Sequence, residues 1–388
     1  MKKNHLKLLA LSLVLPATFA VQSCTDSDEP ITPNTPTGIA ANPNDFKGDV
    51  KSGEKVTLDP AVVYKLTGAV HVKDGGQLII PAGTRIESTG GTAAYITVEQ
   101  GGKIFANGTA SAPVVFTSPT GTAGSWGGIV IAGKAPINKG TTASAEVGNT
   151  TYGGTVANDN SGSLTYVRIE HSGAIFTGEK EFNGLSLFAV GSGTTISNIS
   201  ILNGADDGIE FFGGTVNVSN IISVGNEDDA FDWTEGWNGT ATNIYTKRRA
   251  DGIGNRGIEG DNNANNKDAE PRSNPTIKNA TFIGSTTIGE TDGLKLREGT
   301  FATIDNVVLS NWKTGINIEH DPSVSFFNGG KKVTNVKFDG VLTNASVKAS
   351  AGSPAVTLLP ETYIENANAT GAGNGTSTPT WAATWSGL

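Results

Sequence analysis

The sequence has one cysteine among 388 residues and no excess of basic residues, with 28 Lys and Arg against 37 Asp and Glu. A single cysteine excludes a fold held by disulfide bonds, and a formal net charge of -9 argues against a nucleic acid partner. Aromatic residues make up only 7%, but 37% hydrophobic residues in so long a chain exclude a mainly disordered protein. Glycine is abundant, with 51 residues, and with many Thr and Asn residues it favours short β-strands and tight turns over a helical bundle.

The N-terminus has the features of an export signal. Residues 1–23 combine three lysines with an apolar run that is too short to span a bilayer, so they read as a signal peptide. The run leads to Cys24 in VQSC, which resembles the lipobox of bacterial lipoproteins and implies acylation of Cys24, although Gln22 replaces the small residue usual there. The alternative is an ordinary secretory peptide followed by an unused thiol.

Residues 24–45 are rich in Thr, Pro and Asn and have no hydrophobic period, which predicts a flexible tether. Its acidic cluster directly after Cys24 resembles the signal that sends some lipoproteins to the outer face of the outer membrane. A solvated linker without such a signal is the alternative. The resulting expectation is an outer-membrane lipoprotein that faces the cell exterior, with membrane lipid as one partner.

Two motifs alternate along the rest of the chain. The first places an asparagine between apolar or small residues at spacings of 22 to 36 residues, at Asn198, Asn220, Asn243, Asn279, Asn306 and Asn335. The second comprises NGLSL, DGIEF, DAFDW, DGIGN, DGLKL and TGINI. Periods of this length with β-type residues predict a solenoid. Because no helical period supplies crossover helices, we expect one all-β domain, a right-handed parallel β-helix over 46–345 with an asparagine ladder and a cap or tail at 346–388.

These repeats, over residues 56–338, resemble the right-handed β-helices of the pectate-lyase-like superfamily. The strings SWGGIVIAGKAPIN, DDGIEFFGGTVN and GNEDDAFDW also resemble a group of uncharacterised surface lipoproteins. The resemblance is specific for the fold and weak for activity, because this fold hosts many functions.

Alternation of side chains along the strands predicts two outward-facing rows on one sheet. The first row is expected to contain Ser186, Glu210, Asp232, Gly254, Lys295 and Asn317, and the second Phe188, Phe212, Thr234, Arg256, Arg297 and Glu319. The resemblance implies that such a face holds acidic polysaccharides. The candidate ligand-binding residues are therefore Phe212, Glu210, Asp232, Arg256, Asn317 and Glu319; an ordinary solvated charged face is the alternative.

Aspartates recur at the turn before this sheet, at Asp207, Asp229 and Asp251, 22 residues apart. Carboxylates stacked about 4.8 Å apart repel each other unless a cation or a proton compensates them. No Lys or Arg is expected in this turn column, so a divalent cation, most simply Ca2+, is a candidate ligand of Asp207, Asp229 and Asp251, with Glu210 and Asp232 beside them. A hydrogen-bonded Asp ladder and a set of catalytic acids remain open alternatives.

The nearby basic residues allow a catalytic hypothesis. In lyases of this fold a Lys, Arg or His removes the proton beside a uronate carboxyl, and Lys295 and Arg297 are the candidates here. Arg248, Arg249 and Arg256, in the long rung 247–275, are expected to face an anionic ligand. The main hypothesis is polysaccharide binding by a monomer. The alternatives are a Ca2+-dependent polysaccharide lyase or glycoside hydrolase, and a structural spacer or adhesin.

Overall fold

The computed structural model describes residues 37–249, 251, 253–286 and 289–388. All of them lie within one structural unit, Thr35–Leu388. The expected signal peptide, Cys24 and most of the expected tether lie outside the described residues.

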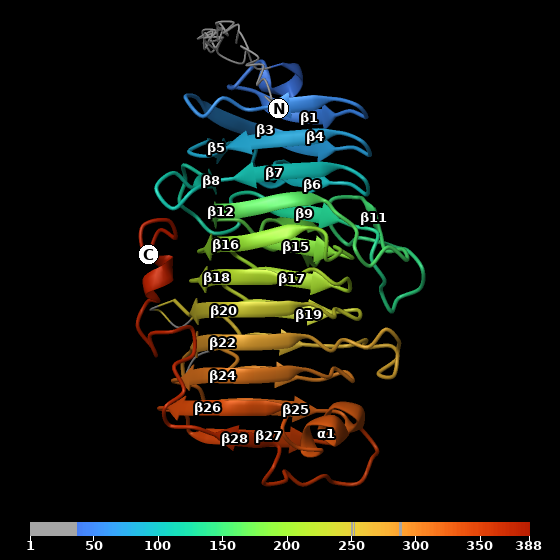
Figure 1. Cartoon of the computed structure of the whole chain (residues 1–388), viewed down its shortest axis with the longest axis vertical. Helices are drawn as coiled ribbons and strands as arrows, with labels where there is room; N and C mark the ends of the chain where they lie inside the picture. The colour runs from blue at the N-terminus through green and yellow to red at the C-terminus, as the bar shows by residue number, and fades with distance from the viewer. Residues whose placement is uncertain (1–36, 250, 252, 287–288) are drawn as a thin grey trace, which may run out of the picture. The chain divides into compact units, whose positions relative to one another are not determined.

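The strands stack in parallel as the successive rungs of a coil (Figure 1). One stack consists of β2 (Lys55–Thr57), β4 (Gln77–Pro81), β7 (Lys103–Asn107), β12 (Gly162–Glu170), β16 (Thr195–Leu202), β18 (Val218–Val224), β20 (Thr240–Lys247), β22 (Thr276–Ile283), β24 (Thr303–Ser310), β26 (Val333–Asp339) and β28 (Tyr363–Glu365). The other consists of β1 (Phe46–Val50), β3 (Val63–Val72), β6 (Ile96–Val98), β9 (Ile129–Ala132), β15 (Leu185–Phe188), β17 (Ile209–Phe212), β19 (Phe231–Thr234), β21 (Ile258–Gly260), β23 (Asp292–Leu296), β25 (Thr314–Glu319) and β27 (Thr343–Lys348). The predicted right-handed parallel β-helix is confirmed.

Shorter elements complete the coil. The strands β5 (Arg85–Ser88) and β8 (Val114–Thr117) connect β3 to β12, and two small hairpins are formed by β10 (Ala143–Ser144) with β11 (Thr151–Tyr152) and by β13 (Ile175–Thr177) with β14 (Lys180–Glu181). The helices are α1 (Asp321–Asn328) and the 3-10 turns η1 (Gly38–Ala40), η2 (Gly91–Ala93) and η3 (Thr380–Ala382). Among the described residues, no helix is long and apolar enough to cross a membrane.

The interior of the coil is a continuous apolar core. Every second side chain of the strands points inward, so Ile209, Phe211, Phe231 and Trp233 are completely buried. Phe211 stacks on Trp237 with ring centroids 3.9 Å apart. Burial of these apolar side chains from every rung stabilises the coil and keeps the outward residues of each strand in register.

The six predicted asparagines lie at a sharp bend in the rungs from β16 to β26, and four of them form a hydrogen-bonded ladder. All six asparagines have φ values of +54 to +60°, a left-handed conformation that asparagine tolerates better than most residues. The side-chain amide of Asn243 donates to Asn220, that of Asn279 to Asn243 and that of Asn306 to Asn279, over 2.8, 3.1 and 2.9 Å. Local backbone preference and hydrogen bonds between rungs therefore select the same residue at this bend.

The C-terminal part of the chain both extends the coil and returns along it. The expected boundary at residue 345 falls inside β27, and β28 adds a further strand beside β26. The last residues then run back beside β20, β18 and β16 (Figure 1). Trp385 and Ala382 cover an outward apolar row that contains Leu202, Ile222 and Tyr245. The tail thus binds several rungs rather than closing the end of the coil.

Candidate functional site

The parallel register defines a row of polar side chains on the outer face of β15 to β25. It consists of Ser186, Glu210, Asp232, Glu259, Lys295 and Asn317, and we call it the site face. Five of its six members were predicted. The prediction of Gly254 is wrong, because the strand of the long rung begins at Ile258 and places Glu259 beside Asp232.

The same shift changes the second outward row and the turn column. Asp261 follows β21 and accepts a hydrogen bond from Arg297 Nε over 3.0 Å, so Asp261 takes the place predicted for Arg256. Arg256 lies one rung below Asp229, whose carboxylate accepts the Arg256 backbone N–H over 2.6 Å. The prediction of a turn column without cations is therefore wrong.

Asp251 does not join the other aspartates. Its carboxylate lies 2.8 Å from Arg249 Nη2, its side chain is nearly half exposed, and the hydrogen bond from Arg249 lowers its pKa. Asp207 and Asp229 do stack as predicted, because Asp207 Oδ1 accepts the Asp229 backbone N–H over 2.9 Å. The 22-residue spacing from Asp229 to Asp251 was misleading, because the additional residues of the long rung lie between β20 and β21.

Phe212 is not an exposed platform for a ligand. Only 6% of it is accessible, and its ring stacks on Phe188 with centroids 4.0 Å apart. Residues of the long connection between β9 and β12, among them Ile137 and Val147, pack in the same apolar cluster. This connection therefore covers the part of the sheet where an aromatic binding surface was expected.

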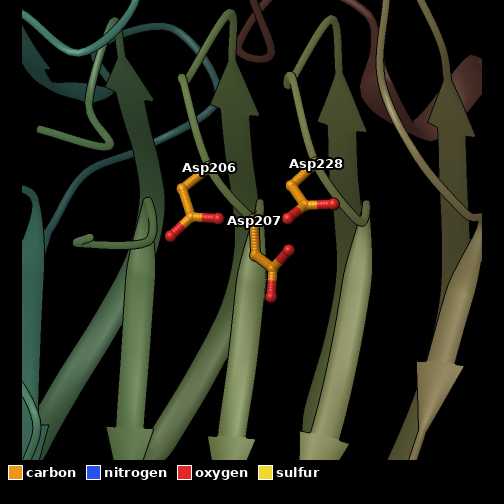
Figure 2. Close-up of side chains that lie close together, drawn as sticks. All are labelled: Asp206, Asp207 and Asp228. Atoms are coloured by element: carbon orange, nitrogen blue, oxygen red, sulfur yellow. The ribbon is translucent and has the colours of Figure 1, made fainter. Parts of the chain in front are cut away.

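Carboxylates gather at the start of β17, β19 and β21. Three groups of three have ligand oxygens within 4.8 Å of one another: Asp206, Asp207 and Asp228; Asp207, Glu210 and Asp232; and Asp229, Asp232 and Glu259. Figure 2 shows the first group, whose carboxylates converge from the turns before β17 and β19. We call the five members of the first two groups the carboxylate cluster.

The third group already contains a cation from the protein. Arg256 Nη1 lies 3.1 Å from Asp229 Oδ2 and forms an ion pair with Glu259, while Arg297 Nη2 lies 2.7 Å from Glu259 Oε2. The carboxylate cluster differs, because none of its five carboxylates forms an ion pair with a Lys, Arg or His in the described part of the chain. Its negative charge is therefore not compensated by a charged side chain.

Burial and mutual repulsion raise the pKa values in the carboxylate cluster. Burial, and after it the charges of Asp228 and Glu181, raises the pKa of Asp206 to about 7. The pKa values of Asp207, Glu210 and Asp232 also rise well above their ordinary range, mainly because burial disfavours their charged forms. Either a proton or an added cation lowers the electrostatic cost of this arrangement.

Asp232 lies at the centre of these acids and has no donor. It is 9% exposed, and no side chain or backbone N–H of the described residues donates a hydrogen bond to its carboxylate. Glu210 receives one, from Asn183 Nδ2 over 2.6 Å. Neither oxygen of Asp232 is among the fully buried polar atoms without a partner, and the burial that raises the pKa of Asp232 favours its protonated form, in which the carboxyl group can itself donate a hydrogen bond.

The two candidate bases are held in ion pairs. Lys295 Nζ lies 2.8 Å from Glu319 Oε1 and 3.5 Å from Asp292 Oδ2, and its side chain is only 11% exposed. Arg297 pairs with Glu259 and Asp261, whose charges outweigh its burial and raise its pKa. Asn317 donates to Asp292 over 2.7 Å. These residues lie together as predicted, but as an internally compensated network.

The arginines of the long rung are also used within the protein. Arg248 donates to the backbone oxygens of Glu290 and Gly254, and Arg249 forms ion pairs with Glu227 and Asp251. With Arg256 bound to Asp229 and Glu259, all three basic residues expected to face an anionic ligand bind acceptors of the chain itself.

Sequence reasoning did not include Glu259, Asp261, Asp206 and Asp228 among the site residues. A signal for Glu259 was present, because Gly257, Ile258 and Glu259 repeat the Gly-Ile-Glu that ends in Glu210. Asp206 and Asp228 were visible as the first members of two Asp-Asp pairs. No sequence signal indicated that Arg256 would replace an aspartate in the turn column.

The comparisons with known proteins support the fold. The sequence model described as the pectate-lyase like beta helix domain matches residues 48–386. Neither the search of curated proteins nor the search of solved structures gave a match. Because the matched region covers most of the described coil, the chain belongs to the family of pectate-lyase-like β-helix domains.

Proposed function

We propose that the protein is a lipid-anchored surface protein that binds an extended polysaccharide along the site face. The observation that carries this proposal is the cluster of five carboxylates that have no ion-pair partner among the described residues, of which Asp206, Asp228 and Glu210 are partly exposed. Sugars are rich in hydroxyl donors, and a regular β-helix repeats acceptor positions about every 4.8 Å along its length. Family membership supports a role that involves polysaccharides. Cys24 is the one thiol available for the lipid anchor.

We further propose that the carboxylate cluster binds a divalent cation, with Ca2+ as the first candidate. Asp207, Glu210 and Asp232 would hold it, because Ca2+ prefers carboxylate and other oxygen ligands and these oxygens lie within 4.8 Å of one another. Asp229, proposed from the sequence as a central ligand, is compensated by Arg256, and Asp251 lies apart. A bound divalent ion would supply positive charge that could orient sugar oxygens.

The cation proposal is tested by melting the full-length protein in EDTA and in millimolar Ca2+. A ligand that binds only the folded state stabilises it by RT ln(1 + [L]/Kd), about 2.7 kcal/mol at a hundredfold excess over Kd. Asp207→Asn should reduce the shift in Tm. Asp339→Asn is a matched control, because Asp339 is exposed at the end of β26, in the other stack of strands. An equal Tm in EDTA and in Ca2+ would refute the cation proposal and favour a ladder of protonated acids.

Polysaccharide binding is tested by calorimetry against a glycan panel, with Asp232→Asn as the site variant and Asp339→Asn as the control. Loss of binding in Asp232→Asn alone is expected. If no glycan binds, the spacer or adhesin hypothesis takes its place.

A lyase or hydrolase is the second candidate function. The observation that favours it is Asp206, whose pKa of about 7 suits a carboxyl group that donates a proton at neutral pH. The ion pairs of Lys295 and Arg297 favour binding without turnover, because a base must be free to accept a proton. Absorbance of unsaturated uronates and an assay of reducing ends distinguish a lyase, a hydrolase and a binding protein.

A further inference from the structure

The two ends of the coil differ in how their apolar cores are covered. At the N-terminal end η1 packs against β1 and β2, Ala40 is buried, and the inward Phe46, Val50 and Val56 of the first rung are completely buried. At the C-terminal end the last strands are β27 and β28, and the tail that follows them runs back along the flank of the coil (Figure 1). The terminal repeats of a solenoid need a cap, and the tail does not supply one here.

The inward side chains of the last rung are only partly covered. Ala345 and Val347 lie next to Ile316 and Ile318 in the same inward columns. The two isoleucines are completely buried, whereas Ala345 and Val347 are partly exposed. Tyr363, on β28, is partly exposed in the same way. The apolar core therefore reaches the surface at this end of the coil.

Both of the last strands also have an unused edge. β27 pairs with β25 and β28 with β26, and no strand of the described residues pairs with the other side of either. Three of the eight exposed large hydrophobic side chains in the described part of the chain lie at this end, namely Leu342, Leu359 and Ile364, with exposed fractions of 70%, 45% and 43%. The connection between the two strands covers the core only in part, through Val356. Unpaired N–H and C=O groups beside apolar side chains form an edge that another β-strand can extend.

Charge favours a second copy of the same chain as the occupant of this end. The whole chain has a formal net charge of -9, so two copies repel each other over most of their surfaces. Residues 340–360 contain a single charged residue, Lys348, and the acids Glu361 and Glu365 follow it. The end thus has few charges, and they are of both signs. Two copies meet there with less repulsion than at the acidic parts of the coil.

We propose that two copies of the chain associate through their C-terminal ends, with β27 of one copy antiparallel to β27 of the other. Such a pair has two-fold symmetry, because both copies use the same surface. A head-to-tail stack is disfavoured, since η1 already covers the N-terminal end. Side chains alternate along a strand, so inward residues of the two copies meet when Ala345 lies opposite its own copy. The pair differs from the monomer expected from the sequence, and it does not depend on what the site face binds.

The test is sedimentation equilibrium of the full-length chain with Cys24→Ser, which removes the only thiol. A contact confined to one end of the coil is smaller than the roughly 800 Å² per copy of a standard interface, so we expect a Kd on the order of 10 µM. The mass should rise from one copy to two between about 1 and about 100 µM and should not rise further. Hydrogen exchange over the same range should slow at the backbone amides of β27 and stay unchanged in β2, at the other end of the coil.

A matched pair of variants locates the contact. Leu342→Lys combined with Leu359→Lys should weaken association at least about tenfold, because it places four like charges between the two copies. Val63→Lys combined with Val156→Lys adds the same charge at side chains that are 41% and 45% exposed elsewhere, and it should leave association unchanged. Circular dichroism verifies the fold of both variants, whose substitutions all lie at exposed positions.

Every other outcome overturns the inference. The mass of one copy at about 100 µM shows that the end does not pair. A mass that grows beyond two copies shows a head-to-tail stack instead of a two-fold pair. A dimer that both double variants weaken equally or leave intact, or protection from exchange outside β27 alone, shows that the contact lies elsewhere. None of these results affects glycan binding at the site face, so the proposed function is judged separately by its own calorimetry.

Discussion

Raising the pH from 5 to 7 in EDTA should destabilise the β-helix through the ionisation of Asp206. The pKa of this carboxyl rises from 3.8 to about 7 in the folded protein. Between these values the folded state binds more protons than the unfolded state, so the free energy of unfolding falls as the pH rises. The stabilising effect of the proton is fully present below the unfolded pKa and is lost as the pH passes through the folded pKa.

The magnitude follows from the same two pKa values. One carboxyl with these values loses about 2 kcal/mol of stability between pH 5 and pH 7, at about 1.4 kcal/mol per pH unit and with the titration half complete at pH 7. For a unit of about 350 residues, an unfolding entropy of roughly 2 cal/mol/K per residue converts this into a fall in Tm of about 3 °C. The lowered pKa of His320 has the opposite sign over part of this range, because its burial favours the neutral ring in the folded state. The contribution of Asp206 is therefore measured as a difference between proteins.

The assay is differential scanning calorimetry of the full-length protein and of Asp206→Asn at pH 5, 6 and 7, in EDTA and in Ca2+. The fall in Tm should be smaller in Asp206→Asn, because an amide does not titrate. Ca2+ should stabilise the wild-type protein more at pH 7 than at pH 5, where protons compete for the same carboxylates. A Tm in EDTA with the same pH dependence in both proteins would refute the reasoning, since the carboxyl would then have similar pKa values in both states.

Three further predictions concern other parts of the chain. Asn279→Ala should lower the free energy of unfolding by about 2 kcal/mol in urea titrations, because it removes two ladder hydrogen bonds and disfavours the left-handed backbone. Asn279→Gly should lower the free energy of unfolding less, and equal losses in the two variants would show that the backbone conformation is unimportant. Arg256→Met should destabilise the folded protein by about 3 kcal/mol at pH 8, because Asp229 and Glu259 lose a buried partner. The loss of stability should be smaller at pH 5, where these acids can be protonated, and a loss that is independent of pH would contradict the ion-pair role. Cys24→Ser should release the protein from membranes in cell fractionation, and unchanged retention would remove the lipid anchor.

The interior of the coil and its bends could be predicted because they depend on short-range physics. An asparagine at a left-handed bend and apolar residues at alternate strand positions recur in the rungs from β16 to β26, so the repeat itself identified the bends at Asn198 to Asn335 and the inward Ile209 and Phe211. The same alternation correctly placed Glu210, Asp232, Lys295 and Asn317 on one outer face.

The sequence by itself thus determined the parallel β-helix, its ladder and most of the site face. Tertiary structure alone decided which residue of the long rung pairs with its neighbours, because several alignments of residues 247–258 preserve the local pattern and only the packing of Ile258 on Leu294 and Phe231 selects one. That choice put Arg256 between Asp229 and Glu259 and left Asp251 at the surface. The burial of Phe212 was also decided by tertiary structure, because the residues that cover it precede it by more than 60 positions. The apolar contacts that hold this connection in place have no periodic signal along the chain.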